Sequence, residues 1–181
     1  MVEPKPFSPV KLICGIIASE ERFFKRAEER LVELYGSLDL ASQIFEFDFT
    51  DYYEEQMGQN LKRKFVSFDN LIFPESLGEI KIRTNALEEE IKEEFKAGKR
   101  IVNLDPGFLT ASALIMATSK DFAHRIPLQH GIFAHLELLF GKNDIRTLSW
   151  TYPDFETKGY QMFLLDVRRI YLSQVQSQKK Y

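Results

Sequence analysis

The run KLICGIIA (residues 11–18), with the helical pattern that follows it, carries most of the architectural information in this chain. Residues 11–18 are continuously apolar and rich in β-branched side chains, which predicts a buried central strand. Ser19 could cap a helix whose apolar positions recur at helical spacing, with charged residues between them. These apolar positions are Phe23, Phe24, Ala27, Leu31, Leu34 and Tyr35. Gly36 is a natural end for this helix.

Two further strands are predicted after this helix. The segments SQIFEFDF (42–49) and LKRKFVSF (61–68) alternate polar and apolar residues, as half-buried strands do. The polar connection between them, residues 50–60, has room for a helical turn. We expect the two strands to form a hairpin around this connection.

A long helix and a fourth strand come next. Pro74 opens a helical pattern that Gly98 ends, and RIVNL (100–104) is typical of a strand. The alternation in EIKIR (79–83) would also fit a strand. We prefer the helix because the 3.6-residue period persists across Thr84.

The remaining residues predict a turn, a hairpin, a strand and a helix. Asp-Pro-Gly at 105–107 is a turn by composition. Residues 110–119 fit either a short helix or a strand. A hairpin is expected over 120–140 and a strand over 145–150, and Asp154 could cap the last helix.

The order strand–helix–strand, given twice over residues 11–104, predicts a ferredoxin-like βαββαβ core. Residues 105–175 would add the hairpin and a covering helix, which makes the fold class α+β. We expect one domain over 1–181, with an extended arm at 1–10 and a frayed tail at 176–181. The rival, a doubly wound α/β fold, needs more parallel crossovers than the pattern offers.

Composition limits the partners and the compartment. The formal net charge is -3, so no general basic field exists to attract nucleic acid. The one cysteine, Cys14, lies in an apolar run and fits a reducing cytoplasm. No apolar run is long enough to cross a bilayer, and the proline-rich start is no signal peptide. We therefore expect a soluble cytoplasmic protein without membrane association.

All three histidines lie between Lys120 and Leu138. A hairpin loop at 129–131 would place Arg125 opposite His135, on one face with Glu137. The other face would then be apolar and would fix the register by its burial. It would contain Phe122, His124, Ile126, Leu128, Ile132, Ala134, Leu136, Leu138 and Phe140.

The three histidines have different interpretations. His124 fits a packed core histidine, and His130 at the loop tip fits a solvated one. His135, beside Arg125 and Glu137, belongs either to a surface pairing cluster or to a recognition surface for an anion. A metal site at His135 lacks a visible third ligand, so no metal site is predicted.

Other patterns indicate little chemistry. The chain contains no phosphate loop, dinucleotide fingerprint, nucleophile elbow, HExxH or paired CxxC. The basic run at 62–64 alternates sides in a strand and fits a charged sheet edge. Trp150 and Tyr152 share one side of an extended segment, where they could pack in the core or hold a planar or anionic ligand.

Several segments together resemble a bacterial domain-of-unknown-function family, numbered 4416. The segments are FTDYYEEQMG (49–58), TNALE (84–88), NLDPGFLT (103–110), KDFAHRI (120–126), GIFAHLEL (131–138) and WTYPDF (150–155). Members sometimes have a GTP-binding label. This sequence gives that label no support, because it contains no phosphate loop. The resemblance implies no reaction, cofactor or catalytic residue. Phe108, Phe122 and Phe155 stand where the family has tyrosine, and Gln56 where it has glutamate.

The leading functional hypothesis is a protein that binds a small anionic ligand, such as a nucleotide or phosphate ester. Arg125 would form a bidentate clamp and His135 a pH-tunable donor. The expected binding residues are Asp105, Lys120, Arg125, His135, Glu137, Trp150 and Tyr152. Two alternatives stay open: a hydrolase that uses His135 with a carboxylate or metal, and a protein-interaction module without a small ligand.

Overall fold

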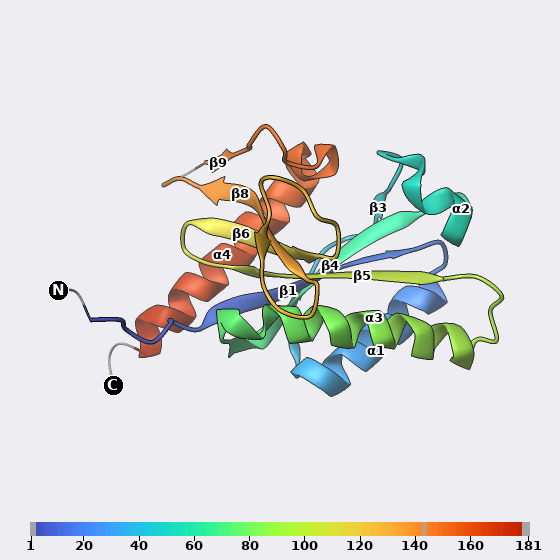
Figure 1. Ribbon diagram of the computed structural model, residues 1–181, viewed down its shortest axis with the longest axis horizontal. Coiled ribbons are helices and arrows are strands. Elements are labelled where there is room, and N and C mark those ends of the chain that lie inside the picture. The colour runs from blue at the N-terminus through green and yellow to red at the C-terminus, as the bar shows by residue number, and fades with distance from the viewer. Residues whose placement is uncertain (1–2, 143, 179–181) are drawn as a thin grey trace.

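The computed structural model describes residues 3–142 and 144–178, and over these ranges the chain forms a nine-stranded antiparallel sheet with helices on both faces (Figure 1). The strands are β1 (Val10–Ala18), β2 (Leu38–Ala41), β3 (Phe45–Glu46), β4 (Lys62–Ile72), β5 (Val102–Leu109), β6 (Ala113–Thr118), β7 (Ile126–Pro127), β8 (Phe133–Phe140) and β9 (Ile145–Arg146). The helices are α1 (Glu21–Tyr35), α2 (Glu54–Met57), α3 (Leu77–Glu94) and α4 (Lys158–Gln178), with 3-10 turns η1 (Asp51–Tyr53), η2 (Pro74–Ser76) and η3 (Pro153–Glu156). The α+β class is confirmed.

The strand order is β2-β4-β1-β5-β6-β8-β7, with β3 beside β4 and β9 beside β8. From β1 to β5 the chain runs β1-α1-β2-β3-α2-β4-α3-β5. An extra strand and a short helix therefore interrupt the expected βαββαβ succession. The ferredoxin-like interpretation of residues 11–104 stays a prediction.

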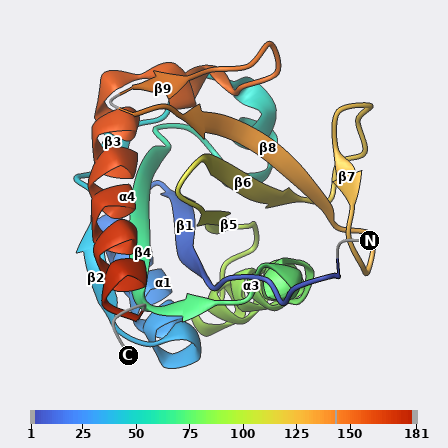
Figure 2. The ribbon, with the colours of Figure 1, turned by 90° about the vertical axis from the view of Figure 1, so that its left-hand side faces the viewer.

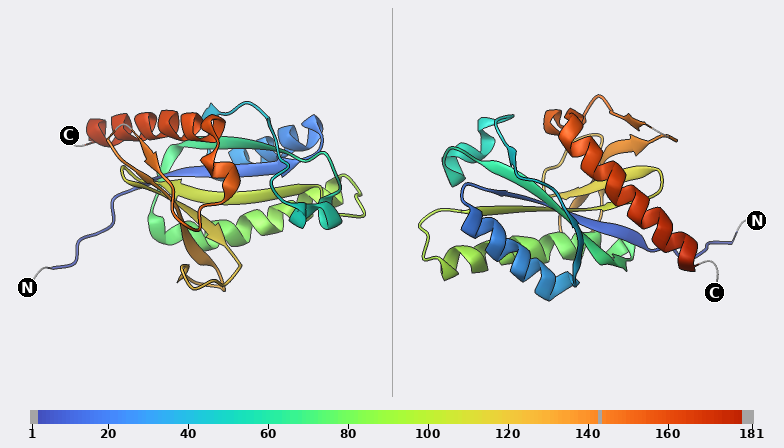
Figure 3. Two further views of the ribbon diagram at one scale, coloured as in Figure 1. Left: turned by 90° about the horizontal axis from the view of Figure 1, so that it is seen from above. Right: turned by 180° about the vertical axis from the view of Figure 1, so that it is seen from behind.

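Strand β1 lies at the centre, and all of its residues are buried. Leu12, Cys14 and Ile16 pack in the cluster formed with α1 and α3, whereas Ile13 packs in the cluster formed with α4. Figures 2 and 3 show α4 crossing one face of the sheet while α1 and α3 cover the other. The predicted buried central strand is confirmed, because both of its faces are covered.

The first helical pattern forms α1, which ends before Gly36 at a φ of 92°. Its cap is different from the prediction. Glu20 occupies the N-cap position without a side-chain hydrogen bond, so Ser19 is not the cap. The segment 79–83 lies within α3, and the strand alternative there is wrong.

Segments with ambiguous patterns were settled by strand pairing. Residues 113–118 form β6 between β5 and β8, so the helix alternative for 110–119 is wrong. The strand predicted over 42–49 shortens to β3, and β2 was missed.

Residues 3–9 are extended without regular structure (Figure 3), and α4 continues to Gln178. None of the helices in the described ranges is long and apolar enough to span a bilayer.

The turn predicted at 105–107 is wrong, since these residues lie inside β5 and pair with β1. The backbone N–H and carbonyl of Leu104 point away from β1, because the N–H donates to Glu88 Oε1 and the carbonyl accepts from Lys81 Nζ. Backbone groups alternate sides along an antiparallel strand, so Pro106 also directs its backbone away from β1, toward β6. Without an N–H, Pro106 cannot continue that ladder.

Strands β5 and β6 therefore pair only over Gly107–Leu109. The absent side chain of Gly107 permits this close approach, because a Cβ there would lie 2.5 Å from Met116 Sδ. Before Gly107 the strands diverge, and α3 side chains satisfy the open edge of β5 instead. The proline and glycine that looked like a turn instead end a strand pairing and open a gap in the sheet.

The hairpin has the predicted register, but the predicted burial holds for only part of it. Ile126 pairs with Ala134, and the loop contains His130 and Gly131 at positive φ. On the predicted apolar face, Ile132, Leu138 and Phe140 are buried, whereas Phe122, Ile126 and Leu128 are 56%, 67% and 40% accessible. The face with Arg125, His135 and Glu137 is also buried, at 8%, 1% and 0%.

Two features explain why the charged face is buried. Leu114 pairs with Leu138 and Ile115 with Leu136, so Glu137 is an extra residue in β8. Such a bulge changes the phase of the alternation, which a strict two-residue period cannot anticipate. In addition, Tyr152 stacks on His135 of the charged face, and Trp150 stacks on His124 beside it.

Candidate functional site

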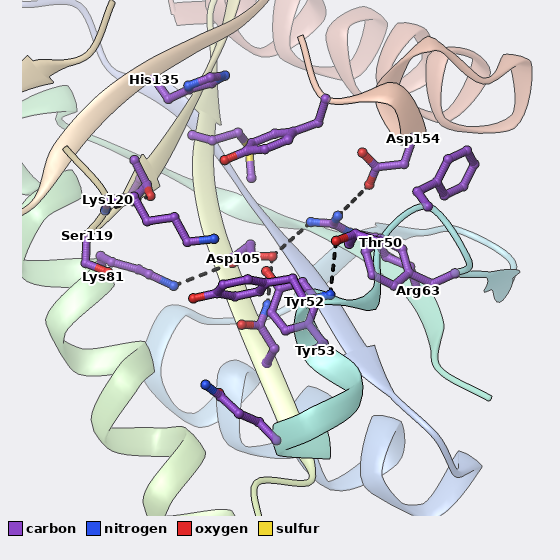
Figure 4. Close-up of a pocket in the computed structure, with 18 of the residues that line it drawn as sticks. Thr50, Tyr52, Tyr53, Arg63, Lys81, Asp105, Ser119, Lys120, His135 and Asp154 are labelled. Atoms are coloured by element: carbon purple, nitrogen blue, oxygen red, sulfur yellow. Dashed lines mark hydrogen bonds and ion pairs between the residues drawn. The ribbon is translucent and has the colours of Figure 1, made fainter. Parts of the chain in front are cut away.

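A cavity of about 640 Å³ lies where β5 and β6 diverge (Figure 4). Asn103 and Asp105 of β5 line one side, and residues 116–120 at the end of β6 line another. The segments 47–56 and 152–155, with one face of α3, complete the walls. Each of these parts comes from a different region of the sequence.

One end of the cavity is built around Arg63 of β4, whose guanidinium lies over Gly15 of β1. A Cβ at Gly15 would lie 2.9 Å from Arg63 Nη2. Across β1, Nη2 meets Asp105 Oδ2 of β5 at 3.0 Å. The glycine in the middle of the apolar central strand therefore makes room for an ion pair that bridges two strands. The basic run at 62–64 is not a charged edge, because β4 pairs there with β1 on one side and with β3 on the other.

Arg63 also holds the segment before α4. Its Nη1 donates to Asp154 Oδ2 at 2.6 Å, and both residues are buried. Asp154 is thus an ion-pair partner and lies in η3, ahead of α4. Burial opposes the charge of Arg63, but Asp154 and Asp105 outweigh it and raise the pKa of the guanidinium. Burial raises the pKa of Asp154, against the effect of Arg63.

Asp105 is the point where these interactions meet. Burial would raise its pKa, but Lys81, Arg63 and a 2.7 Å hydrogen bond from Asn103 Nδ2 hold the pKa below its usual range. Lys81 Nζ lies 3.6 Å from Asp105 Oδ1. Asp105 is consequently an ionised carboxylate at neutral pH, and it faces the cavity.

Lys81 and Glu88 enter the site from α3. Lys81 Nζ donates to the Leu104 carbonyl at 2.7 Å, and Glu88 Oε1 accepts the Leu104 N–H at 2.6 Å. Glu88 also pairs with Arg100, which donates to Asn103 Oδ1 at 2.6 Å. Buried charged groups require such partners. For both Lys81 and Glu88, one partner is a backbone group of Leu104 at the unpaired edge of β5.

Among the cations that line the cavity, Lys120 has the fewest negatively charged neighbours in the described ranges. Its ammonium lies 3.5 Å from the centre of the Tyr52 ring, an arrangement typical of cation–π attraction. Within the described part of the chain, no carboxylate lies within ion-pair distance of Lys120 Nζ. Figure 4 shows Lys120 and Lys81 reaching into the cavity from one side, with Tyr52 and Tyr53 opposite.

Aromatic rings form much of the remaining wall. They belong to Phe47, Phe49, Tyr52, Tyr53, Tyr152 and Phe155. The charge of Asp105, followed by burial, raises the pKa of Tyr53 far above the physiological range. Burial also raises the pKa of Tyr152, although Arg125 opposes this. Both phenols therefore stay neutral and can donate hydrogen bonds.

Behind this wall, Arg125 connects three residues that line the cavity. Its Nη1 donates to the Lys120 carbonyl at 2.7 Å, its Nη2 to Tyr152 Oη at 2.7 Å, and its Nε to His135 Nδ1 at 3.1 Å. Arginine has no acceptor, so Nδ1 must be unprotonated and the imidazole proton sits on Nε2. That atom lies 2.9 Å from Glu137 Oε2 without the alignment of a hydrogen bond.

His124 and Trp150 cover the outer side of this network. His124 Nε2 lies 3.2 Å from His135 Nδ1, and its ring stacks on Trp150 with centroids 5.0 Å apart. Desolvation, then the nearby His135 and Arg125, lower the pKa of His124. Trp150 Nε1 donates to the Leu136 carbonyl at 2.8 Å. His124 therefore packs against aromatic rings, as predicted, but it is half-buried and does not belong to the core.

The sequence-predicted site residues divide into two groups. Asp105, Lys120, His135 and Tyr152 line the cavity. Arg125, Glu137 and Trp150 support it from behind and do not line it. Both ring nitrogens of His135 face protein groups, which leaves no lone pair directed at the cavity for a hydrolytic base. Among the described residues, no group of three His, Cys, Asp or Glu side chains could hold a metal ion.

Sequence reasoning missed Arg63, Lys81 and Asp154. Two signals could have found the first two. A glycine in a continuously apolar strand is destabilising unless something approaches it closely, which indicates a partner over Gly15. Lys81 and Glu88 are spaced by seven residues and share one face of α3, so a charged pair lies on a buried helix face. No local signal links Asp154 to Arg63.

These features define an α+β protein with a polar, aromatic-walled cavity at a divergence in its sheet. Residues 8–171 match the family described as a domain of unknown function, DUF4416. The chain belongs to this family. No curated protein and no solved structure matches the chain.

Proposed function

We propose that the cavity binds a small ligand with an anionic group, such as a nucleotide or a phosphate ester. The observation that supports this most directly is the pair of ammonium groups, Lys81 and Lys120, which face one cavity of about 640 Å³. Lysine ammonium groups bind phosphate as compact point charges. Ser119 lies next to Lys120 in the same wall and offers a hydroxyl.

The charges of the lining explain where the anion would bind. Arg63 is compensated by two carboxylates and Arg100 by Glu88. Lys81 shares Asp105 with Arg63. Among the residues that the structure describes, Lys120 contacts the Tyr52 ring and has no carboxylate partner, so the net positive charge of these residues is concentrated at the Lys120 side. The anionic group would therefore lie between Lys120 and Lys81.

The rest of the cavity suits an uncharged, planar portion of the ligand. Its volume falls within the roughly 300–1,000 Å³ typical of small-molecule sites. Tyr52, Tyr53 and Tyr152 supply ring faces and phenols. Asn85 also lines this region, and among the described residues its amide has no protein hydrogen-bond partner to compete with a ligand.

The test is isothermal titration calorimetry with inorganic phosphate, pyrophosphate, mononucleotides and sugar phosphates. For a ligand that binds the wild type, Lys120→Ala should weaken affinity at least about tenfold, because a charge-assisted contact contributes about 1.5–3 kcal/mol. Lys142→Ala is the matched control, since Lys142 is exposed and outside the cavity. Equal affinities for the two variants would contradict the assignment.

A further inference from the structure

Resting on the proposed function, we propose that Arg125 is the positioning residue of this site. It would not contact the ligand. Instead it would hold Lys120 and Tyr152 in place for binding. This replaces the bidentate clamp that the sequence predicted for Arg125.

The geometry of the guanidinium carries this assignment. Arg125 is 8% accessible and does not line the cavity, yet its hydrogen bonds end on three residues that do. Two of these bonds, to the Lys120 carbonyl and Tyr152 Oη, are 2.7 Å long. A planar, forked donor fixes the relative positions of its acceptors, which a single ammonium cannot do.

The backbone around Lys120 depends strongly on this contact. Residues 119–125 lie between β6 and the two-residue β7 and belong to no strand. Besides the Arg125 bond to the Lys120 carbonyl, the backbone of this stretch is held by the Lys120 N–H on Thr118 Oγ1 and by a turn from the Arg125 N–H to the Phe122 carbonyl. The side chain of His124 adds a stack on Trp150 at the far end of the stretch from Lys120. Loss of the Arg125 bond would free the peptide that presents the Lys120 ammonium to the cavity.

The third bond of Arg125 anchors the guanidinium to β8. His135 Nδ1 accepts from Arg125 Nε at 3.1 Å, and His124 Nε2 lies 3.2 Å from the same atom. The imidazole itself lies between the Tyr152 ring, stacked at 5.2 Å, and Glu137, whose Oε2 lies 2.9 Å from Nε2. The guanidinium is therefore held by β8 on one side and holds the Lys120 segment on the other.

The first arm of the experiment needs no ligand. Hydrogen exchange over residues 119–125 is measured by mass spectrometry for the wild type, Arg125→Gln, Arg125→Lys and the control Arg146→Gln. Arg146 is an exposed arginine of β9 without a hydrogen bond to the cavity. Arg125→Gln should exchange at least about tenfold faster in this segment and Arg146→Gln at the wild-type rate. Unchanged exchange in a folded Arg125→Gln protein would overturn the positioning role.

The second arm measures pyrophosphate affinity at neutral pH. Arg125→Gln should bind at least about tenfold more weakly than the wild type, because the Lys120 segment is no longer held in place. Arg125→Lys should bind with an affinity in between, since it restores one donor, and Arg146→Gln should bind like the wild type. Wild-type affinity in a folded Arg125→Gln protein would overturn the positioning role.

The two proposals fail in different ways. Absence of binding by the wild type to every anion tested would overturn the proposed function, while the exchange measurement would still decide whether Arg125 orders residues 119–125. Normal binding by Arg125→Gln, together with loss of binding in Lys120→Ala, would leave the site intact and overturn the positioning role.

Discussion

The protein buries two arginines at the same cavity, and they are held in different ways. Arg63 lies on a central strand, and its guanidinium meets two carboxylates, Asp105 and Asp154. Arg125 lies beside the last strand pair, and its three acceptors are an imidazole nitrogen, a carbonyl and a phenol. The acceptors of Arg63 are carboxylates, whereas those of Arg125 are uncharged groups.

This difference separates structural support from a role in binding. A buried ion pair is costly to break, because removal of one partner leaves an uncompensated charge in the interior. A set of neutral acceptors leaves no such charge, so its loss costs less stability and mainly changes local order. We therefore expect variants around Arg63 to affect folding, and variants around Arg125 to affect the cavity wall near Lys120.

The largest effect should follow from Arg63→Ala. Asp105 and Asp154 would remain buried without their shared partner, and the free energy of unfolding should fall by about 3–5 kcal/mol. Urea denaturation monitored by circular dichroism measures it. Lys62→Ala is the control, because Lys62 is half-exposed and lies 3.7 Å from Glu46, a surface pair worth at most about 1 kcal/mol. Similar losses in both variants would remove the contrast between the two arginines.

A smaller loss is expected for Gly15→Ala. The new methyl group would meet Arg63 Nη2 at 2.9 Å and the Phe65 ring at 3.1 Å, so the guanidinium must shift from its carboxylates. Overpacking of this kind costs about 1–3 kcal/mol. Gly98→Ala, where no atom lies within 4 Å of the added Cβ, is the matched control in the same denaturation assay. A Gly15→Ala protein as stable as wild type would show that Arg63 does not need the space over β1.

The smallest effect should appear only in acid. The pKa of Asp105 is lower in the folded protein than in the unfolded chain, so its contribution is complete above the unfolded value and is lost as pH falls through the folded one. The stability advantage of the wild type over Asp105→Asn should therefore shrink below about pH 4. Denaturation curves at several pH values measure it. An advantage that grows on acidification would mean that Asp105 is protonated in the fold.

Local sequence patterns predicted only part of the candidate site. Asp105, Lys120, His135 and Tyr152 could be named from the sequence because they are polar or aromatic residues in the predicted hairpin or in the short segments that flank it. The cavity also needs Arg63 and Asp154, which are 91 positions apart. Nothing in the residues around either one specifies the other, because their contact exists only after β4 and η3 meet.

The sequence alone determined the buried strand at 11–18, the helices that became α1 and α3, and the pairing of Ile126 with Ala134. Each depends on a local period or on the number of residues in a loop, which neighbouring residues specify by themselves. Tertiary structure decided that the charged face of the hairpin is buried, because this burial depends on how β8 pairs with β6 around Glu137 and on the packing of the segment at 150–152. It also turned Pro106 and Gly107 from an apparent turn into the point where two strands part, since a missing N–H matters only when a neighbouring strand could have accepted it.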